Sequence, residues 1–438
     1  MRPATARGFR DVLPQEAAER EAVAFRIAET LSAWGYGLVE TPVVEDLAAL
    51  EAAAGPLQGT AFRLIDLDGR LLALRPDMTV PIARLVASRL VGDAGPFRFR
   101  YGAQVFREHE SLRGQAREFT QVGVELVGEV GPAADAEVVS LLVAALETSG
   151  LPEFTVALGT VAVLHAIVSA AQAPAAWGKA VLSAAHDRNL VGLDALAREL
   201  GDSAAARALR AVPRIRGGRA AIEECRAVTR GLACEATLDE LAETWRLIEV
   251  AGAAERVVVD FSVMRSFDYY TGMVAEAYAP GLGLPLGGGG RYDGVLAAFD
   301  APAPAAGFAL GLERIMIALV EQGKAVAVRE LDAVLGGDAG SALAVARELR
   351  EAGWRVALSR RDGLELVREA TRLGAAEALS CGGRGAVRLD REGERALPLE
   401  SPPPYPPTTT WAEPTTDTPR ATEAEPAAND VAAPGGER

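Results

Sequence analysis

Residues 106–128 read FREHESLRGQAREFTQVGVELVG, a charged segment between two apolar ones. The apolar positions predict two strands, Phe97–Phe106 and Gln121–Leu126, joined by the polar loop Arg107–Thr120. Strands joined in this way are typical of an antiparallel pair, and a charged loop of this length in a compact domain is usually functional. The segment therefore predicts an antiparallel sheet that carries a functional loop.

The flanking sequence predicts helices around this sheet. Before the loop we expect a helix at Pro14–Trp34, a strand near Gly37–Glu40, a hairpin around Asp68-Gly69 within Phe62–Leu74 and a helix at Thr79–Val91. After it we expect a mostly helical insertion at about residues 133–252, with one strand near Phe154–Leu158. Further strands are expected at Val257–Phe261 and Gly272–Tyr278. A glycine-rich turn at Gly281–Gly290 and a strand or turn passing into a helix at Gly307–Val320 follow.

The C-terminal part of the chain changes character twice. Beyond residue 330, strands and helices alternate, which predicts a small α/β domain with short parallel strands. From about Leu399 the sequence is rich in Pro, Thr, Glu and Ala and has few large apolar residues, which predicts a disordered tail. We therefore expect a core over residues 1–325, an α/β domain over residues 330–398 and a tail over residues 399–438.

The predicted tail gives a first testable expectation. Its composition cannot bury enough apolar surface to offset the entropy of ordering the chain. Deleting residues 399–438 is expected to leave the thermal midpoint and the oligomeric state unchanged, as measured by calorimetry and light scattering. A large fall in either quantity would show that the tail packs against the rest of the protein.

Composition and charge restrict the function classes. The chain has 438 residues, of which 49% are hydrophobic and 24% charged, so it can build a packed core. It lacks an uncharged apolar run of about 18 residues and an apolar N-terminal segment, so we expect a cytoplasmic protein without a membrane span. The formal net charge of −15 disfavours a partner rich in phosphate, such as tRNA.

The three cysteines and three histidines do not form a recognisable metal or disulfide pattern. Cys225, Cys234 and Cys381 contain no CxxC pair, and the histidines have no metal-ligand spacing. We therefore expect no metal and no cofactor. His165 lies in the apolar run VAVLHAIV, where a hydrogen-bonded core histidine is the simpler interpretation.

Several motifs occur in a fixed order between residues 8 and 315. They are GFRDVLP at Gly8–Pro14, ALRPDMT at Ala73–Thr79, the segment at Phe106–Gly128, MRSFDYYTG at Met264–Gly272, GGGGRYDG at Gly287–Gly294 and GFALGLERI at Gly307–Ile315. In this order they resemble the histidyl-tRNA synthetase-like proteins of class II. The resemblance implies an α+β class II core, with an antiparallel sheet flanked by helices, that dimerises. It also implies that the small C-terminal α/β domain is a vestige of the anticodon-binding domain.

The resemblance also implies a histidine-binding site. Positions matching Asp77, Thr79 and Gln121 face the ammonium group of histidine in the family, and those matching Glu125 and Tyr270 hydrogen-bond the imidazole. The position matching Arg265 lies beside the carboxylate, and Tyr269 continues the pocket wall. The glycines Gly287–Gly290 would let the backbone approach a ligand closely. The full set of expected histidine-binding residues is Asp77, Met78, Thr79, Arg107, Gln121, Glu125, Arg265, Tyr269 and Tyr270. A departure is Asp77, because the synthetases carry a glutamate there.

The part of the site that holds ATP in the synthetases departs from the family pattern. His109 stands at a position of glutamate, and Glu110 and Gln115 stand at positions of arginine. Exchanging a cation for an anion in a triphosphate-binding loop opposes phosphate binding. The C-terminal domain is also poorly equipped for RNA, since residues 330–395 contain twelve acids against eleven arginines. We therefore expect no catalytic residues.

These losses resemble those of a non-catalytic branch of the family, which carries LRPDMT where the synthetases carry LRPEGT. Members of this branch activate a short-form ATP phosphoribosyltransferase catalytic subunit and make the complex sensitive to histidine, in the first step of histidine biosynthesis. The resemblance thus implies that subunit as the partner, histidine as the effector and a homodimer within a hetero-oligomer. Two alternatives stay open at this point: a working histidyl-tRNA synthetase, and a histidine-sensing protein for another target.

Overall fold

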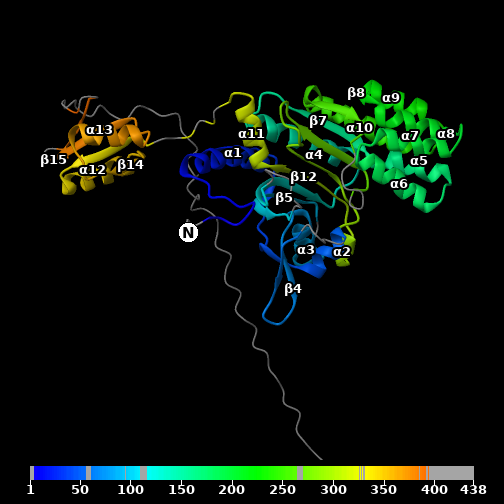
Figure 1. The fold of residues 1–438 in the computed structure, drawn as a ribbon, viewed down its shortest axis with the longest axis horizontal. Coiled ribbons are helices and arrows are strands. Elements are labelled where there is room, and N and C mark those ends of the chain that lie inside the picture. Colours follow the sequence, from blue (N-terminus) through cyan, green and yellow to red (C-terminus); the bar gives the residue numbers. More distant parts are fainter. Residues whose placement is uncertain are drawn as a thin grey trace, which may run out of the picture. The chain divides into compact units, whose positions relative to one another are not determined.

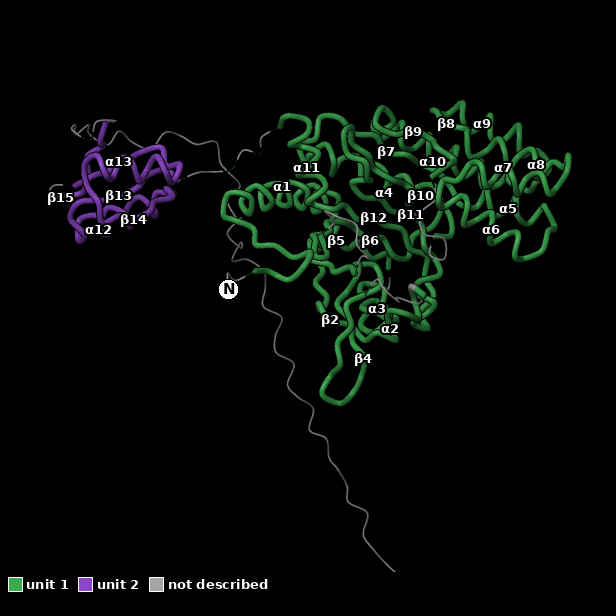
Figure 2. The backbone as a smooth tube through the Cα atoms, viewed as in Figure 1, with its two compact units in different colours: residues 1–328 green, residues 329–438 purple. Residues whose placement is uncertain are grey.

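The computed structural model describes residues 4–55, 61–93, 95–108, 116–263, 270–324, 326, 328, 331–383, 385–390 and 393. The chain divides into two compact units, residues 1–328 and residues 329–438 (Figure 2). The expected tail at residues 399–438 lies outside the described residues, as do Arg265, Tyr269, His109, Glu110 and Gln115.

The first unit is built on a large mixed sheet (Figure 1). Among the described residues, nine strands occur in the order β1-β5-β6-β12-β11-β10-β7-β9-β8. Their bounds are β1 Gly37–Leu38, β5 Phe97–Phe106, β6 Glu118–Val127, β7 Thr155–Thr160, β8 Arg216–Gly217, β9 Val257–Asp260, β10 Met273–Tyr278, β11 Gly287–Arg291 and β12 Ala305–Gly311. The β1–β5 and β7–β9 pairs are parallel and the other pairs are antiparallel.

Helices cover one face of this sheet and enclose the main core. α1 (Pro14–Ala33), α4 (Gly131–Thr148), α10 (Glu235–Val250) and α11 (Leu312–Glu321) supply its helical side. In α1, the buried side chains Val23, Ile27 and Leu31 recur at helical spacing and pack against apolar residues of β6 such as Val124. This expected helical periodicity is confirmed, and it fixes which face of each element points inward.

The opposite face carries a smaller layer, which contains the candidate site. It consists of α2 (Leu47–Ala54), α3 (Thr79–Arg89) and a three-stranded sheet of β2 (Val44–Asp46), β4 (Leu71–Leu74) and β3 (Arg63–Ile65). Ile82 of α3 packs with Tyr101 and Val105 of β5, so α3 lies directly against the large sheet. The antiparallel β5–β6 pair expected from the sequence is confirmed, with Gly123 opposite Tyr101 and Glu125 opposite Phe99.

The helical insertion lies at one end of the large sheet (Figure 1). It comprises α5 (Val161–Ala171), α6 (Ala175–His186), α7 (Leu190–Glu199), α8 (Ala204–Ala211), the 3-10 turn η1 (Val212–Arg214) and α9 (Arg219–Val228). Two further 3-10 turns, η2 (Ala254–Arg256) and η3 (Leu296–Phe299), lie elsewhere in the unit. His165 of α5 is exposed, so its interpretation as a core histidine was wrong. The apolar residues beside it in the sequence turn inward because helical geometry places only part of each turn against the core.

The glycine-rich segment is a strand rather than a turn in its second half. Gly287–Arg291 forms β11, buried along its whole length between β10 and β12. A Cβ atom on Gly287 would lie 2.7 Å from the Cα atom of Leu310, so β12 itself occupies the space that a side chain would need. The expectation of a turn at Gly281–Gly290 was therefore wrong for these residues, because the glycines permit close packing of strands.

The second unit is an α/β domain, as expected from the alternating pattern. Its described strands have the order β14-β13-β15-β16, with bounds β13 Ala333–Gly337, β14 Val356–Leu358, β15 Glu377–Gly382 and β16 Gly385–Arg388. α12 (Ala339–Glu351) packs with Leu335 and Cys381 in one cluster, and α13 (Gly363–Arg372) packs with Val334 and Ala378 in another. Successive residues of β13 thus point to opposite faces, each covered by one helix. None of the described helices has the length and apolarity needed to cross a membrane.

Candidate functional site

The candidate site is centred on Glu125 of β6. Alternation along this strand directs Gln121, Gly123 and Glu125 to the face that carries α3, whereas Val122 and Val124 point into the helical core. The structure therefore brings Gln121 and Glu125 together with the segment Asp77–Thr79, which leads into α3. Two residues of the same strand, four positions apart, form one wall of the site.

The Glu125 carboxyl group is buried, with a residue exposure of 2%, and both of its oxygens accept hydrogen bonds. Oε1 accepts a hydrogen bond from Thr79 Oγ1 at 2.7 Å and a longer one from Tyr101 Oη at 3.4 Å. Oε2 accepts a hydrogen bond from Tyr292 Oη. The partners come from α3, from β5 and from the segment after β11, so three separate parts of the chain position one carboxyl group.

Burial determines the proton affinity of Glu125. It raises the pKa of this carboxyl to about 8, because a charged carboxylate loses its hydration in the interior. Hydrogen bonds from Tyr292, Thr79 and Tyr101 oppose the rise, and the nearby Asp77 adds to it. At neutral pH the group is therefore mainly protonated when no ligand is present.

Glycines on the neighbouring strands make room for this arrangement. A Cβ atom on Gly307, which pairs with Glu125 across β12 and β6, would lie 3.0 Å from Glu125 Cδ and closer still to Oε2. A Cβ atom on Gly290 would lie 2.8 Å from Cδ1 of Tyr270. Tyr270 thus packs on β11, where the sequence interpretation had placed a ligand-facing turn.

Asp77 and Arg107 lie at the second side of the site. Asp77 Oδ1 accepts a hydrogen bond from the Val80 backbone N–H at 3.2 Å. Burial raises the pKa of the Asp77 carboxyl. The Arg107 charge and the hydrogen bonds from the Val80 and Thr79 backbone N–H groups lower this pKa, but by less. Arg107 Nε donates to the Pro76 carbonyl at 2.8 Å, and its guanidinium group lies 5.3 Å from the centre of the Phe119 ring.

Gln121 carries an unsatisfied acceptor. This residue is 7% exposed, and its Oε1 atom is buried without a hydrogen-bond partner among the described residues. A buried carbonyl oxygen without a partner costs about 1–3 kcal/mol, so its retention calls for an explanation. A donor group such as an ammonium, placed against this atom, would supply the missing hydrogen bond.

Met78 differs from its neighbours. Its side chain is fully buried with Ile82, Tyr101 and Val105, so only its backbone can face a ligand. Thr79, which the sequence predicts to face the ammonium group, donates a hydrogen bond to Glu125. Arg265 and Tyr269, the remaining expected residues, lie outside the described part of the chain.

Sequence reasoning missed the two tyrosines that bind Glu125. Tyr101 lies in the strand sequence FRFRYGAQVF, where an aromatic residue is ordinary packing material. Tyr292 lies within the quoted motif GGGGRYDG, so the motif itself was the only available signal. Their partner is 24 positions away from Tyr101 and 167 away from Tyr292, and no local pattern reports such a contact.

The arginine of the last motif is held by the protein itself. Arg314 Nη1 donates to the Pro285 carbonyl at 2.7 Å. Its neighbour Glu313 accepts hydrogen bonds from the Thr120 backbone N–H at 3.0 and 3.1 Å and pairs with Arg20. These contacts tie α11 to β6 and α1, which is a structural role.

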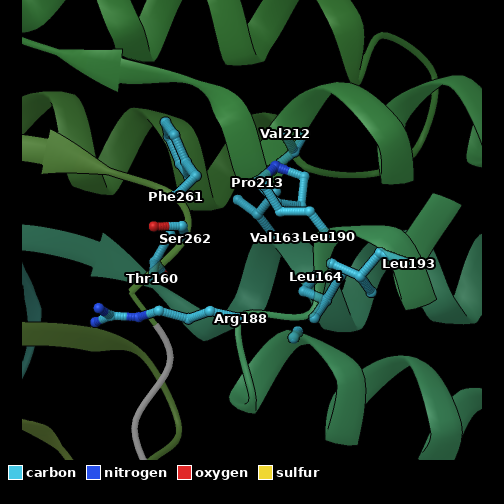
Figure 3. A pocket seen from close by; sticks show the side chains of 11 residues that line it. Thr160, Val163, Leu164, Arg188, Leu190, Leu193, Val212, Pro213, Phe261 and Ser262 are labelled. Atoms are coloured by element: carbon cyan, nitrogen blue, oxygen red, sulfur yellow. The ribbon is translucent and has the colours of Figure 1, made fainter.

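A cavity of about 20 Å³ lies elsewhere, between the helical insertion and the large sheet (Figure 3). Its lining consists of Thr160, Val163, Leu164, Ala185, Arg188, Leu190, Leu193, Val212, Pro213, Phe261 and Ser262. A volume of this order holds about one water molecule and is too small for an amino acid. None of the expected histidine-binding residues lines it. Within the described ranges, no three His, Cys, Asp or Glu side chains are grouped so as to hold a metal ion.

Comparison with known proteins places this geometry in a family. The family model described as histidyl-tRNA synthetase matches residues 8–315. The regulatory subunit of ATP phosphoribosyltransferase from Moorella thermoacetica is 42% identical over 354 residues, which cover 80% of this chain and 90% of that protein. The Bacillus subtilis protein of the same description is 34% identical over 370 residues, covering 83% and 93% of the two chains.

Solved structures agree with the sequence relatives. A structure described as an ATP phosphoribosyltransferase regulatory subunit/histidyl-tRNA synthetase from Bacillus halodurans superimposes with a TM-score of 0.77 at 32% identity, covering 85% of this chain and 97% of that one. Histidyl-tRNA synthetase from a Nostoc species gives a TM-score of 0.76 at 21% identity, with coverages of 91% and 96%, and shows the shared fold. The chain therefore belongs to the histidyl-tRNA synthetase-like family and, within it, to the ATP phosphoribosyltransferase regulatory subunits.

Proposed function

We propose that the pocket around Glu125 binds free histidine and that this binding controls a short-form ATP phosphoribosyltransferase catalytic subunit in a cytoplasmic hetero-oligomer. Family membership gives the regulatory role in histidine biosynthesis. The pocket as the effector site, the homodimer within the complex and the dependence of the catalytic chain on this one are the proposal. The observation that carries it is the buried, unpartnered Oε1 atom of Gln121 beside the buried Glu125 carboxyl.

The chemistry of the pocket matches the two ends of a histidine molecule. At one end, Gln121 Oε1 and the Asp77 carboxyl offer acceptors to an ammonium group. At the other end, Glu125 and Tyr270 are groups suited to the two nitrogens of an imidazole ring. In the proposal, Arg265 and Arg107 balance the ligand carboxylate, and Tyr269 and the Met78 backbone complete the wall.

Regulation follows from linkage between the two binding events. If histidine binds one conformation of the complex more tightly than another, it shifts the population toward that conformation by the difference in binding free energy. Histidine is the end product of the pathway, so the favoured conformation is the less active one. The same coupling requires the catalytic chain to change the affinity of this chain for histidine.

The two alternatives differ from this proposal in testable ways. A working synthetase is disfavoured because a relative that aligns with 80% of this chain is a regulatory subunit. It is also disfavoured because Glu110 and Gln115 stand where the synthetases carry arginines. A histidine sensor for another target would share the pocket, so only an assay with the catalytic chain separates it from the proposal.

Replacing Glu125 with alanine tests the pocket directly. The variant is expected to lose about 1–3 kcal/mol of histidine affinity, about 5- to 150-fold in Kd, because an imidazole N–H loses its acceptor. Titration calorimetry measures the loss. Glu118→Ala serves as the matched control, because Glu118 lies on the same strand seven positions away and points to the opposite face.

The same variants are then assayed in the complex with the catalytic chain. Glu125→Ala is expected to leave the complex active at histidine concentrations that inhibit the wild type, while Glu118→Ala behaves like the wild type. Equal histidine affinity in wild type and Glu125→Ala would place histidine sensing elsewhere in the complex. Histidine binding without any effect on phosphoribosyl transfer would favour the sensor for another target.

A further inference from the structure

Within the described ranges, the hydrogen-bond partners of Glu125 are hydroxyl groups only. Thr79, Tyr101 and Tyr292 supply them, and each hydroxyl can donate to a carboxylate or accept from a protonated carboxyl. A hydroxyl cage of this kind accommodates Glu125 with or without its proton. Cationic partners, by contrast, would hold the group in its ionised form.

The charged and titratable groups that face Glu125 come from each element around it. Asp77 precedes α3, Tyr101 lies on β5 and Tyr292 follows β11. Tyr36, which precedes β1, is close enough for the Glu125 charge to raise its pKa, and Tyr270, which precedes β10, acts on Tyr101. Burial raises the pKa of Tyr101 well above its ordinary value, so this hydroxyl stays neutral.

Cations are engaged elsewhere in the described part of the chain. Arg107 is placed toward Asp77, and Arg291, next to Tyr292 in the sequence, is paired with Asp135. No described Arg or Lys forms an ion pair with Glu125. The carboxyl group is thus enclosed by neutral hydroxyls and one further acid.

We propose that Glu125 and a ring nitrogen of the bound histidine share a single proton, so that histidine affinity is highest near neutral pH and falls on both sides. The inference rests on the proposed histidine-binding function and specifies how the pocket recognises the ligand. Either a neutral carboxyl donates to a neutral imidazole, or a carboxylate accepts from an imidazolium. Both descriptions contain the same number of protons and the same hydrogen bond.

The proton count fixes the pH dependence of binding. Near neutral pH the empty pocket holds the proton on Glu125, and the ring of free histidine, with a pKa of about 6.5, is mainly neutral. Binding then takes up or releases few protons. Above the pKa of Glu125 the empty pocket has already released that proton. Histidine binding then requires that a proton be taken up from solvent. Histidine affinity then falls, approaching tenfold for each pH unit. Below the pKa of the ring, both partners carry a proton, one must leave, and affinity falls again.

Titration calorimetry at pH 7 and pH 9, each in two buffers of different ionisation enthalpy, tests the alkaline side. For the wild type, Kd is expected to rise about tenfold between these pH values through Glu125 alone, with close to one proton taken up at the higher pH. Free histidine also loses the proton of its ammonium group in alkaline solution. Glu125→Gln measures that part, because glutamine keeps the shape and does not titrate.

Two further measurements separate the proposal from a merely structural role. Tyr292→Phe removes a hydrogen bond that lowers the pKa of Glu125, so the alkaline fall in affinity is expected to shift to higher pH. Thienylalanine, which has a five-membered aromatic ring without nitrogen, is expected not to compete with histidine, because Glu125 would remain buried without its ring partner. Thermal midpoints confirm that each variant is folded.

The possible outcomes are distinct. A steeper alkaline loss in the wild type than in Glu125→Gln, with proton uptake, supports the shared proton. Equal pH dependence in both proteins, or binding without proton uptake at pH 9, overturns it while leaving histidine binding intact. If Glu125→Gln fails to bind, the shift in Tyr292→Phe decides, and an unshifted profile counts against the proposal. Absence of histidine binding at every pH in the folded wild type overturns the proposed function itself.

Discussion

Gly289→Ala is expected to destabilise the first unit severely. A Cβ atom at this position of β11 would lie 2.6 Å from the Cα atom of Phe308 and even closer to the Gly307 carbonyl oxygen on β12. These are backbone atoms of a strand that is itself paired on both sides, so they cannot rotate away as a side chain could. The expected cost is about 3 kcal/mol or more, at the upper end of overpacking effects.

Thermal denaturation provides the measurement, and Gly102→Ala provides the matched control. Gly102 lies on β5 of the same sheet, and a Cβ atom there would have no neighbour within 4 Å. The control is expected to melt within about a degree of the wild type, whereas Gly289→Ala should melt lower by roughly 4 °C or more, given the size of the first unit. Similar midpoints for the two variants would contradict the close packing of β11 on β12. Histidine binding should also weaken, because β11 leads directly to Tyr292.

The second large effect is expected for Arg291→Met. Arg291 ends β11, and its Nε and Nη2 atoms donate to Asp135 Oδ1 at 2.9 and 2.7 Å. The two side chains are only 9% and 13% exposed. Removing the arginine leaves the Asp135 carboxylate buried without its cation. Loss of one partner of a buried ion pair costs about 3–5 kcal/mol in the free energy of unfolding.

The pH dependence of this variant identifies the cause. Burial already raises the pKa of Asp135, although Arg291 lowers it, and without Arg291 the pKa rises further. A folded-state pKa above the unfolded value of 3.8 gives stability that is present at low pH and lost as the pH increases. The deficit of Arg291→Met relative to wild type is therefore expected to be smaller at pH 5 than at pH 8.

Two further variants control this interpretation. Arg246→Met breaks an exposed pair with Glu243, so its cost is expected to stay below about 0.5 kcal/mol. Adding Asp135→Asn to Arg291→Met removes the buried charge and is expected to recover part of the lost stability. If the double variant is no more stable than Arg291→Met, the loss arises from packing rather than from the unpaired carboxylate.

Much of the fold follows from local sequence patterns. The expected strand Phe97–Phe106 coincides with β5, and the expected helix at Thr79–Val91 corresponds to α3 at Thr79–Arg89. These elements are defined by periodic apolar positions within about ten residues, which is the distance over which backbone geometry acts. The alternation along β6 similarly places Gln121 and Glu125 on one face without knowledge of the neighbouring strands.

The glycine segment shows where local patterns fail. Gly287–Gly290 predicts a turn when it is considered alone, because glycine disfavours strands and permits turns. It becomes a strand because β10 and β12 provide hydrogen-bond partners on both sides and because Leu310 leaves no space for a side chain. The same limitation affected His165, since the sequence does not tell which side of α5 the neighbouring helices cover.

The sequence by itself determined the family, the order of the elements and the presence of an acid, an amide and a hydroxyl at Glu125, Gln121 and Thr79. Only the tertiary structure decided that Tyr101 and Tyr292 enclose Glu125 in hydroxyl groups and that Gln121 keeps an acceptor without a partner in the described part of the chain. Covalent connectivity and hydrophobic period act over short distances along the chain. Burial and hydrogen bonding of a carboxyl group depend on residues up to 167 positions away, which meet only when the sheet has formed.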